Sequence, residues 1–208
     1  MSSRRSTIAT FLLCLALFTT ACNVAGQAST PAPPSVPAGQ AVLPTIKART
    51  IILVRHGEVD LKNKDAGLTP EGLRRAEDLA VALKDAGVTK IFTSEKLRTQ
   101  QTAEALAKQL KIAGDPGIPQ MSKMPEILGY IRDHIGKDDV VLIVYHSYSI
   151  PGMVKALTGM AEGPVADETF DNLFVFTPDA TGTRYRLVHG RYGAPSPAPA
   201  AAPVKTAP

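Results

Sequence analysis

Two runs of consecutive apolar residues limit what this chain can fold into more than any other feature of its sequence. Residues 51–54 read Ile-Ile-Leu-Val and residues 140–144 read Val-Val-Leu-Ile-Val. A strand with one exposed face alternates apolar and polar residues, so unbroken runs rich in β-branched residues are typical of strands buried on both faces. The chain is therefore expected to build a central sheet that other elements cover on both sides.

Helix signals stand between and after these two runs. Thr69 and Pro70 mark a helix start, because Thr is a favoured N-cap residue and Pro is favoured in the first turn. This helix should end at Gly87, since Gly is favoured just beyond a helix. Its expected inner stripe consists of apolar residues at helical spacing: Leu73, Ala76, Ala80 and Leu83. Further helices are indicated over residues 103–110 and 151–157.

Shorter segments complete an alternating order of strands and helices. Residues 91–92 form a short strand that runs into Thr93, and residues 173–177 and 185–188 have the pattern of closing strands. Repeated strand–helix units of this length predict parallel strands, because a parallel connection needs a crossover. The expected fold class is therefore α/β, a three-layer sandwich with a mostly parallel central sheet and helices on both faces.

A histidine follows each of the two most apolar strands. His56 comes after the first strand and its neighbour Arg55, and His146 comes after the second. Arg98 follows the strand that ends at Thr93. The carboxyl ends of parallel strands lie at one edge of a sheet, so these side chains should meet there although they are far apart in sequence. Two imidazoles and two guanidiniums at one edge predict an anion site.

Phosphoryl transfer is the chemistry that uses such a set. Guanidinium groups bind phosphate oxygens in pairs and stay charged at any working pH. A neutral imidazole, whose pKa is ordinarily about 6.5, can attack phosphorus with its free lone pair. The second histidine, in its protonated form, would stabilise charge on the phosphate oxygens. We expect no metal and no other cofactor, because the cations do that work.

Several segments are similar to motifs of one known family. Residues 53–58, Leu-Val-Arg-His-Gly-Glu, contain an Arg-His-Gly signature. Four further stretches agree with it in order and spacing: 68–76, 93–103, 144–147, and 171–174 together with 191–193. The set resembles the compact branch of the histidine phosphatase superfamily, also called phosphoglycerate-mutase-like. The resemblance covers about residues 50–193.

The resemblance implies a role for each matching residue. His56 is the expected phospho-acceptor, Arg55 and Arg98 bind the phosphate, and His146 completes the pocket. Gly57 and Ser147 join the expected substrate-binding residues. Ser147 and Ser149 could equally cap the helix that follows.

The general acid is less well marked by the resemblance. Longer members of the family place it between the second helix and the second-histidine strand, which points to Glu126 here. Glu58, Asp60 or Asp65 could serve instead, and some compact members have no dedicated acid.

Other polar residues have structural interpretations. His134 should lie at a helix C-terminus, where a cation is favourable, and His189 should end the last strand. Arg75 is expected at the surface of an amphipathic helix, with extension toward the pocket as the alternative. Tyr145 and Tyr148 either shape the substrate mouth or are buried against the sheet. The remaining arginines of the last strand are expected on its solvated face: Arg184, Arg186 and Arg191.

Residues 1–22 are expected to be a secretory signal. Arg4 and Arg5 supply positive charge, and the apolar stretch 8–18 is too short to span a bilayer as a helix. The chain is therefore expected to be exported.

The end of this signal resembles a lipobox. Residues 19–22 read Thr-Thr-Ala-Cys, so either Cys22 is lipidated after cleavage or cleavage falls near Ala25 or Ala28. The expected location is the periplasm or the outer membrane as a lipoprotein, with membrane contact only through a lipid on Cys22.

The rest of the chain divides by composition. Residues 23–45 form a Pro- and Ala-rich linker, residues 46–193 the phosphatase-like domain, and residues 194–208 a disordered Pro- and Ala-rich tail. The domain has no cysteine, so its stability must come from its core.

Charge excludes one class of partner. The formal net charge of +4 falls by two units when Arg4 and Arg5 leave with the signal, and no run of five basic residues occurs. We therefore expect no nucleic-acid binding. The default oligomeric state is a monomer, since no long apolar surface stripe is visible.

The sequence supports one function over two alternatives. We expect an exported phosphatase, a hydrolase of the histidine acid phosphatase type, that acts on phosphomonoesters or phosphohistidine through phospho-His56. Its partner would be a phosphorylated small molecule or a phosphoprotein. The alternatives are a phosphoglycerate-mutase-type phosphotransferase and a catalytically silent phosphate-binding module of the envelope.

Overall fold

The two apolar runs form neighbouring strands in the middle of one sheet. They are β1 (Thr50–Arg55) and β4 (Val140–Tyr145), which run parallel with Arg55 opposite Tyr145. Every residue of β4 is buried, as expected for a strand covered on both faces. This computed structural model describes residues 46–60, 62–63 and 67–197.

Some of the predictions fall outside the described residues. They concern the signal at 1–22, Cys22, the linker at 23–45, Asp65 and residues 198–208. All described residues belong to one compact unit. No helix in the described part of the chain is long and apolar enough to cross a membrane.

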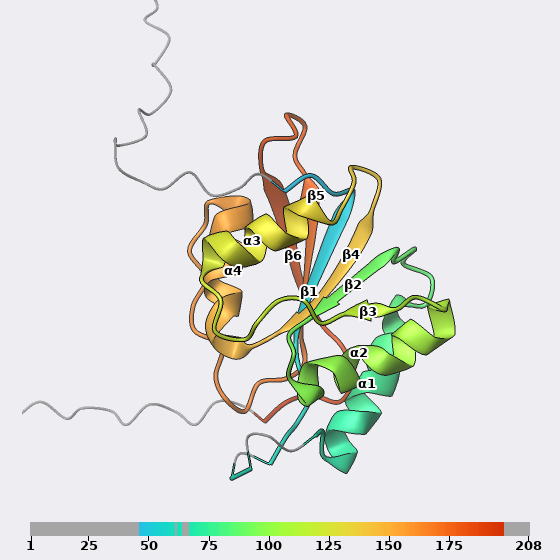
Figure 1. The fold of residues 1–208 in the computed structure, drawn as a ribbon. Coiled ribbons are helices and arrows are strands. Elements are labelled where there is room, and N and C mark those ends of the chain that lie inside the picture. Colours follow the sequence, from blue (N-terminus) through green and yellow to red (C-terminus); the bar gives the residue numbers. More distant parts are fainter. Residues whose placement is uncertain (1–45, 61, 64–66, 198–208) are drawn as a thin grey trace, which may run out of the picture. The chain divides into compact units, whose positions relative to one another are not determined.

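The sheet has six strands in the order β3-β2-β4-β1-β5-β6 (Figure 1). Strands β3, β2, β4 and β1 are mutually parallel, while β5 is antiparallel to β1 and β6 is antiparallel to β5. The remaining strands are β2 (Lys90–Thr93), β3 (Gly114–Asp115), β5 (Asn172–Pro178) and β6 (Tyr185–Arg191). The mostly parallel sheet is confirmed, and only β3 was not predicted, because two residues carry no pattern.

Helices cover both faces of the sheet, as the fold class required. They are α1 (Pro70–Leu83), α2 (Leu97–Leu110), α3 (Met124–Asp133) and α4 (Ile150–Thr158). Helices α1 and α2 pack their buried apolar residues on one face of the sheet. Helices α3 and α4 pack on the other (Figure 1). The three-layer sandwich is therefore confirmed.

Helix α1 begins as predicted, and three residues of its predicted inner stripe, Ala76, Ala80 and Leu83, are buried. The Thr69 hydroxyl accepts a hydrogen bond from the Gly72 N–H at 3.2 Å, as an N-cap should. Leu73 is 46% exposed, so its place in the predicted stripe was wrong. Gly72 and Leu79 are buried on this inner face as well, and a side chain at Gly72 would clash with the backbone of Glu58.

Contacts with the domain continue beyond Gly193. The Ser196 hydroxyl accepts hydrogen bonds from the N–H groups of Phe170 and Asp171 at 2.8 and 3.1 Å. The carbonyl of Ala194 accepts a hydrogen bond from Arg75 at 2.9 Å. These residues therefore fix the loop that leads into β5.

Candidate active site

The carboxyl ends of three parallel strands bring the predicted histidines and arginines together. Arg55 ends β1, His56 and His146 follow β1 and β4, and Arg98 lies in the first turn of α2 after β2. The two imidazole ring centroids are 5.5 Å apart. All four side chains are buried, and they line one hollow of about 200 Å³. The predicted convergence is therefore what the structure shows.

The tautomer of His56 follows from one contact. Its Nδ1 lies 2.8 Å from the carbonyl oxygen of Gly57. A carbonyl can only accept, so Nδ1 carries the hydrogen and Nε2 keeps its lone pair. Burial, and secondarily the cations of Arg55 and Arg98, lower the pKa of His56 to about 3. The imidazole is therefore neutral at neutral pH and can act as a nucleophile.

His146 has the opposite tautomer. Its Nδ1 lies 3.5 Å from Nη2 of Arg98, which can only donate, and its Nε2 lies 3.0 Å from the Ser94 hydroxyl. Nε2 therefore carries the hydrogen and donates it to Ser94. Burial, followed by the nearby His56 and Arg98, lowers the pKa of His146 to about 3. The expected protonated form is thus not the resting form, because burial and neighbouring cations disfavour the charge.

Arg55 has a second task besides facing the hollow. Its Nη1 donates to the carbonyl oxygens of Ala166, Asp167 and Thr169 at 2.7–3.1 Å. Its guanidinium carbon lies 4.1 Å from the ring centroid of Phe170. Among the described residues, its buried Nε has no hydrogen-bond partner. Arg55 therefore holds the loop before β5 while part of its guanidinium stays available to an anion.

Two of the other predicted residues do not reach the hollow. The Gly57 N–H donates to the Thr102 hydroxyl at 2.9 Å, so it is not available to a phosphate. Gly57 is needed for packing instead, since a Cβ there would lie 3.0 Å from the carbonyl oxygen of Gly72. Glu126 is exposed on α3, and its carboxylate accepts from the Lys123 N–H at 2.9 Å. Its assignment as the general acid is corrected, because helix α3 turns it toward solvent.

Arg75 is buried, contrary to the prediction of a surface residue. Only 4% of it is exposed, and its Nε and Nη2 both contact the carboxylate of Glu58 at 2.6–3.0 Å. Its Nη1 donates to the carbonyl of Tyr192 at 3.2 Å. Burial opposes the charge, but the Glu58 carboxylate raises the pKa of Arg75 above its ordinary value. Both residues are therefore committed to an internal ion pair behind the Arg-His-Gly loop.

Five further residues complete the lining of the hollow: Val59, Gln120, Ser147, Tyr148 and Asp167. The Tyr148 ring stacks on His146 at 5.5 Å between centroids, and its hydroxyl donates to the Gln120 carbonyl at 2.7 Å. Sequence reasoning missed Gln120 and Asp167, because both lie in loops without a periodic pattern. Ser147 lines the hollow as expected.

Tyr145 and Tyr148 each follow one of the two predicted alternatives, burial against the sheet for Tyr145 and a place at the site for Tyr148. Tyr145 is fully buried and donates to the Pro119 carbonyl at 2.6 Å, whereas Tyr148 is 57% exposed at the mouth. The alternative role of Ser149 as a cap is not seen, since it makes no side-chain cap bond at the start of α4.

The remaining histidines and arginines lie away from the hollow. His134 caps the end of α3, with Nδ1 2.8 Å from the Tyr130 carbonyl, and His189 lies in β6 with Nε2 3.0 Å from the Asn172 side chain. The interpretation of His134 is confirmed, whereas His189 lies within the last strand, which continues to Arg191. The arginines expected on the solvated face are exposed: Arg184, Arg186 and Arg191.

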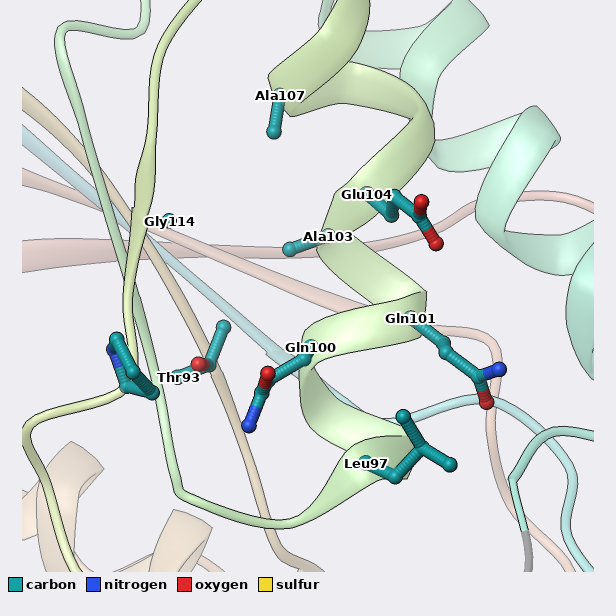
Figure 2. Close-up of a pocket in the computed structure, with 9 residues that line it drawn as sticks. Thr93, Leu97, Gln100, Gln101, Ala103, Glu104, Ala107 and Gly114 are labelled. Atoms are coloured by element: carbon teal, nitrogen blue, oxygen red, sulfur yellow. The ribbon is translucent and has the colours of Figure 1, made fainter.

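A larger hollow of about 360 Å³ lies elsewhere, between α2 and β3 (Figure 2). Gln100, Gln101 and Glu104 project from α2 along it (Figure 2). None of its described lining residues is a histidine, lysine or arginine. Its size therefore exceeds that of the histidine-lined hollow, but it lacks groups for phosphoryl transfer.

Comparison with known sequences identifies the segment that carries the first motifs. Residues 51–122 match the family model of the histidine phosphatase superfamily, branch 1. The chain is 35% identical over 80 residues to "Probable phosphoglycerate mutase GpmB" of Proteus mirabilis, a match that covers 34% of this chain and 37% of that protein. It is 43% identical over 68 residues to human 6-phosphofructo-2-kinase/fructose-2,6-bisphosphatase 4, covering 29% of this chain and 14% of that protein. The matches span 37% of the first relative and 14% of the second.

Solved structures share the fold at low sequence identity. A mycobacterial glucosyl-3-phosphoglycerate phosphatase in complex with inorganic phosphate aligns with a TM-score of 0.51 and 15% identity, over 68% of this chain and 96% of that one. A structure described as mycobacterial hydrolase 1 aligns with a TM-score of 0.51 and 16% identity, over 68% and 97%. These likenesses establish the phosphoglycerate-mutase-like α/β fold.

Proposed function

We propose that this chain, a member of the histidine phosphatase superfamily, hydrolyses phosphomonoesters through a phosphohistidine formed on His56. The observation that carries the proposal is the tautomer of His56. The Gly57 carbonyl holds the hydrogen on Nδ1, so Nε2 has a free lone pair beside the guanidiniums of Arg55 and Arg98. A neutral nucleophile next to two phosphate-binding cations is the arrangement that the reaction needs.

The reaction has two steps. Nε2 of His56 attacks phosphorus, the phosphorus–nitrogen bond forms, and the bond to the leaving oxygen breaks as that oxygen takes a proton. Water then attacks phosphorus, releases phosphate and returns the electron pair to Nε2. Arg55 and Arg98 neutralise the phosphate oxygens.

The segment between α2 and β4 favours hydrolysis over a mutase reaction. A mutase must keep its intermediate from water while the substrate turns, which calls for a cover over the site. Of residues 111–139, only Gln120 lines the hollow. Helix α3 of this segment packs Ile127, Leu128 and Ile131 against the sheet instead of over the site. This segment therefore does not form a cover over the hollow, which favours direct attack by water.

The first test is turnover of p-nitrophenyl phosphate. His56→Asn should lower kcat by a factor of about 1,000 or more, because the nucleophile is lost. The matched control is His189→Asn, whose side chain bonds Asn172 away from the hollow. Unchanged activity in His56→Asn would refute the proposal, and phosphate binding without turnover by the wild-type protein would favour the silent module.

The second test identifies the intermediate. Quenching during turnover should trap a phosphoprotein that is labile to acid and stable to base, as a phosphohistidine is. The label should be absent from His56→Asn and present in His189→Asn. An acid-stable phosphoester in its place would assign the nucleophile to another residue type.

The proposal extends to location and substrate class. The signal-like residues 1–22 support export, either with lipid on Cys22 or as a soluble protein of the periplasm. The substrates would then be phosphorylated small molecules or phosphoprotein side chains outside the cytoplasm. Cell fractionation of the wild-type protein and Cys22→Ala tests this directly. Loss of the membrane-bound fraction in Cys22→Ala supports lipidation, and a wild-type protein retained in the cytoplasm contradicts export.

A further inference from the structure

The first chemical step needs a proton donor that the four convergent residues do not supply. Both histidines are neutral in the resting hollow, with the His56 hydrogen held by the Gly57 carbonyl and the His146 hydrogen directed to Ser94. Guanidinium groups do not give up a proton in proteins. Glu126 is exposed and bonded to Lys123 outside the hollow. The donor must therefore be sought among the remaining lining residues.

The side-chain chemistry of most of these residues excludes them as proton donors. Val59 has no exchangeable side-chain hydrogen, and the Gln120 amide and the Ser147 hydroxyl do not transfer protons readily near neutrality. Burial raises the pKa of Tyr148, and its hydroxyl already donates to the Gln120 carbonyl. Asp167 is the one carboxyl-bearing residue among the described residues that line the hollow.

Two acidic alternatives named from the sequence, Glu58 and Asp60, are not among the residues that line the hollow, nor is the nearby Glu95, and Asp65 lies outside the described residues. Glu58 is bound through its carboxylate by Arg75. Asp60 accepts a hydrogen bond from the Lys62 N–H at 2.9 Å, and it is not among the lining residues. Glu95 accepts from the Gln120 N–H at 2.7 Å and also lies outside the lining. Among the described residues, this leaves Asp167 as the carboxyl group at the site.

Asp167 is held next to the phosphate-binding end of Arg55. Its own backbone carbonyl accepts the shortest of the three bonds from Arg55 Nη1, at 2.7 Å. Its carboxylate also acts electrostatically on the Arg55 guanidinium, more strongly than that of the neighbouring Glu168. Asp167 is exposed to solvent and is also one of the residues that line the hollow. This position places a carboxyl group where a leaving oxygen can meet it.

We propose that Asp167 is the general acid and base of the phosphatase reaction, an assignment that rests on the function proposed above. In the first step the carboxyl group gives its proton to the leaving oxygen as the phosphorus–oxygen bond breaks. In the second step the carboxylate takes a proton from the attacking water as the phosphorus–nitrogen bond breaks. One water is consumed, one alcohol and one phosphate are released, and Asp167 returns to its starting form.

Binding of a phosphate ester explains how the Asp167 carboxyl group comes to hold a proton. A carboxylate and a phosphate dianion in one hollow of about 200 Å³ repel each other, so a shared proton is favoured when an ester is bound. This charge arrangement also explains why an acidic residue can stand at an otherwise cationic site. Asp167 is therefore a catalytic residue that touches the reacting oxygen.

The test uses phosphate esters with different leaving groups. Asp167→Asn should lower kcat/KM about 100-fold or more for ethyl phosphate, whose alkoxide leaves poorly without a proton. The same variant should lose less than about fivefold for p-nitrophenyl phosphate, whose phenolate leaves without help. The ratio kcat/KM isolates the first step, because it does not include hydrolysis of the phosphohistidine. Glu168→Gln is the matched control and should change neither value more than about twofold, since Glu168 does not line the hollow.

The outcomes separate this inference from the proposed function. An equal loss for both esters in Asp167→Asn would overturn the acid role, because a residue that only positions the loop has no reason to distinguish leaving groups. Absence of turnover of either ester by the wild-type protein would overturn the proposed function and the acid role with it. Asp167→Glu keeps the carboxyl group, and recovery of part of the ethyl phosphate activity in it is the second expected result.

Discussion

Arg75 and Arg55 are both almost fully buried, but their guanidinium groups have different hydrogen-bond acceptors. Around Arg75, the Glu58 carboxylate takes two nitrogens of the guanidinium, and backbone carbonyls take the rest. Around Arg55, only backbone carbonyls accept hydrogen bonds, and Nε has no partner among the described residues. A buried cation hydrogen-bonded to a carboxylate indicates a structural role, whereas a buried cation with no carboxylate in hydrogen-bond contact indicates a place for an anionic ligand.

The largest expected effect falls on the region around Arg55. Arg55→Met should lower kcat/KM for p-nitrophenyl phosphate by about 1,000-fold, equal to about 4 kcal/mol of transition-state stabilisation. The free energy of unfolding should fall by less than about 2 kcal/mol, because lost bonds to carbonyls are offset by removal of a buried charge. Enzyme assays and urea unfolding of the same preparation measure both quantities. If Arg55→Met kept its activity but lost stability, the role of Arg55 would be structural and the comparison with Arg75 would be wrong.

The region around Arg75 should respond in the opposite way. Arg75→Met should lower the free energy of unfolding by about 3 kcal/mol, because the Glu58 carboxylate loses its partner in a mostly buried position. This is the low end for a buried pair, since the Glu58 side chain is 23% exposed. Activity measured well below the unfolding temperature should fall less than in Arg55→Met. The double variant Arg75→Met/Glu58→Leu should recover part of the stability. A further loss would contradict the interpretation of Arg75 and Glu58 as a structural ion pair.

A smaller loss of activity is expected for a substitution of Arg98, which lines the same hollow as Arg55. Arg98→Lys should lower kcat/KM by about 10- to 100-fold, because a point charge cannot reproduce the forked contact of a guanidinium with phosphate. Arg186→Lys on the exposed side of β6 is the matched control and should be neutral. Unchanged kcat/KM in Arg98→Lys would place Arg98 outside the phosphate contacts.

A further prediction concerns the pH dependence of stability that the two buried histidines cause. The folded-state pKa of His56 and His146 is about 3, below the ordinary value of about 6.5, so the unfolded chain binds more protons between these values. Stability is therefore fully present above about pH 6.5 and declines as pH falls toward 3, by up to about 1.4 kcal/mol per pH unit for each histidine.

Urea unfolding in phosphate-free buffer at about pH 7 and pH 5 measures this decline. His146→Gln should lose about half of the pH dependence, because one of the two buried imidazoles is gone. Equal slopes in the variant and the wild-type protein would mean that other groups control the acid response.

Most of the fold and the centre of the site could be predicted from the sequence, because both depend on strands. The unbroken apolar runs predicted β1 and β4, and residues that follow parallel strands must meet at one edge. Thr69 likewise predicted the start of α1 through its own side-chain chemistry. In contrast, β3 has two residues and no pattern to detect.

Residues that depend on folded surroundings could not be predicted in the same way. Arg75 has the spacing of a surface residue, but in the folded chain it contacts Glu58, Tyr192 and Ala194, which are distant from it in sequence. Glu126 lies in the expected stretch of sequence, but the orientation of α3 decides where its carboxylate points. The charge of His146 depends on burial and on Arg98, neither of which a strand pattern reports.

The two edge strands of the sheet, β3 and β6, affect the tendency of the protein to aggregate at high concentration. At one border, β3 has two residues, and at the other the exposed side chains of β6 include Arg186 and Arg191. Unpaired backbone groups on a long, flat, apolar border invite strands from other molecules, and shortness and positive charge both oppose this pairing. The parallel core that builds the site is thus shielded on both sides from amyloid-like stacking.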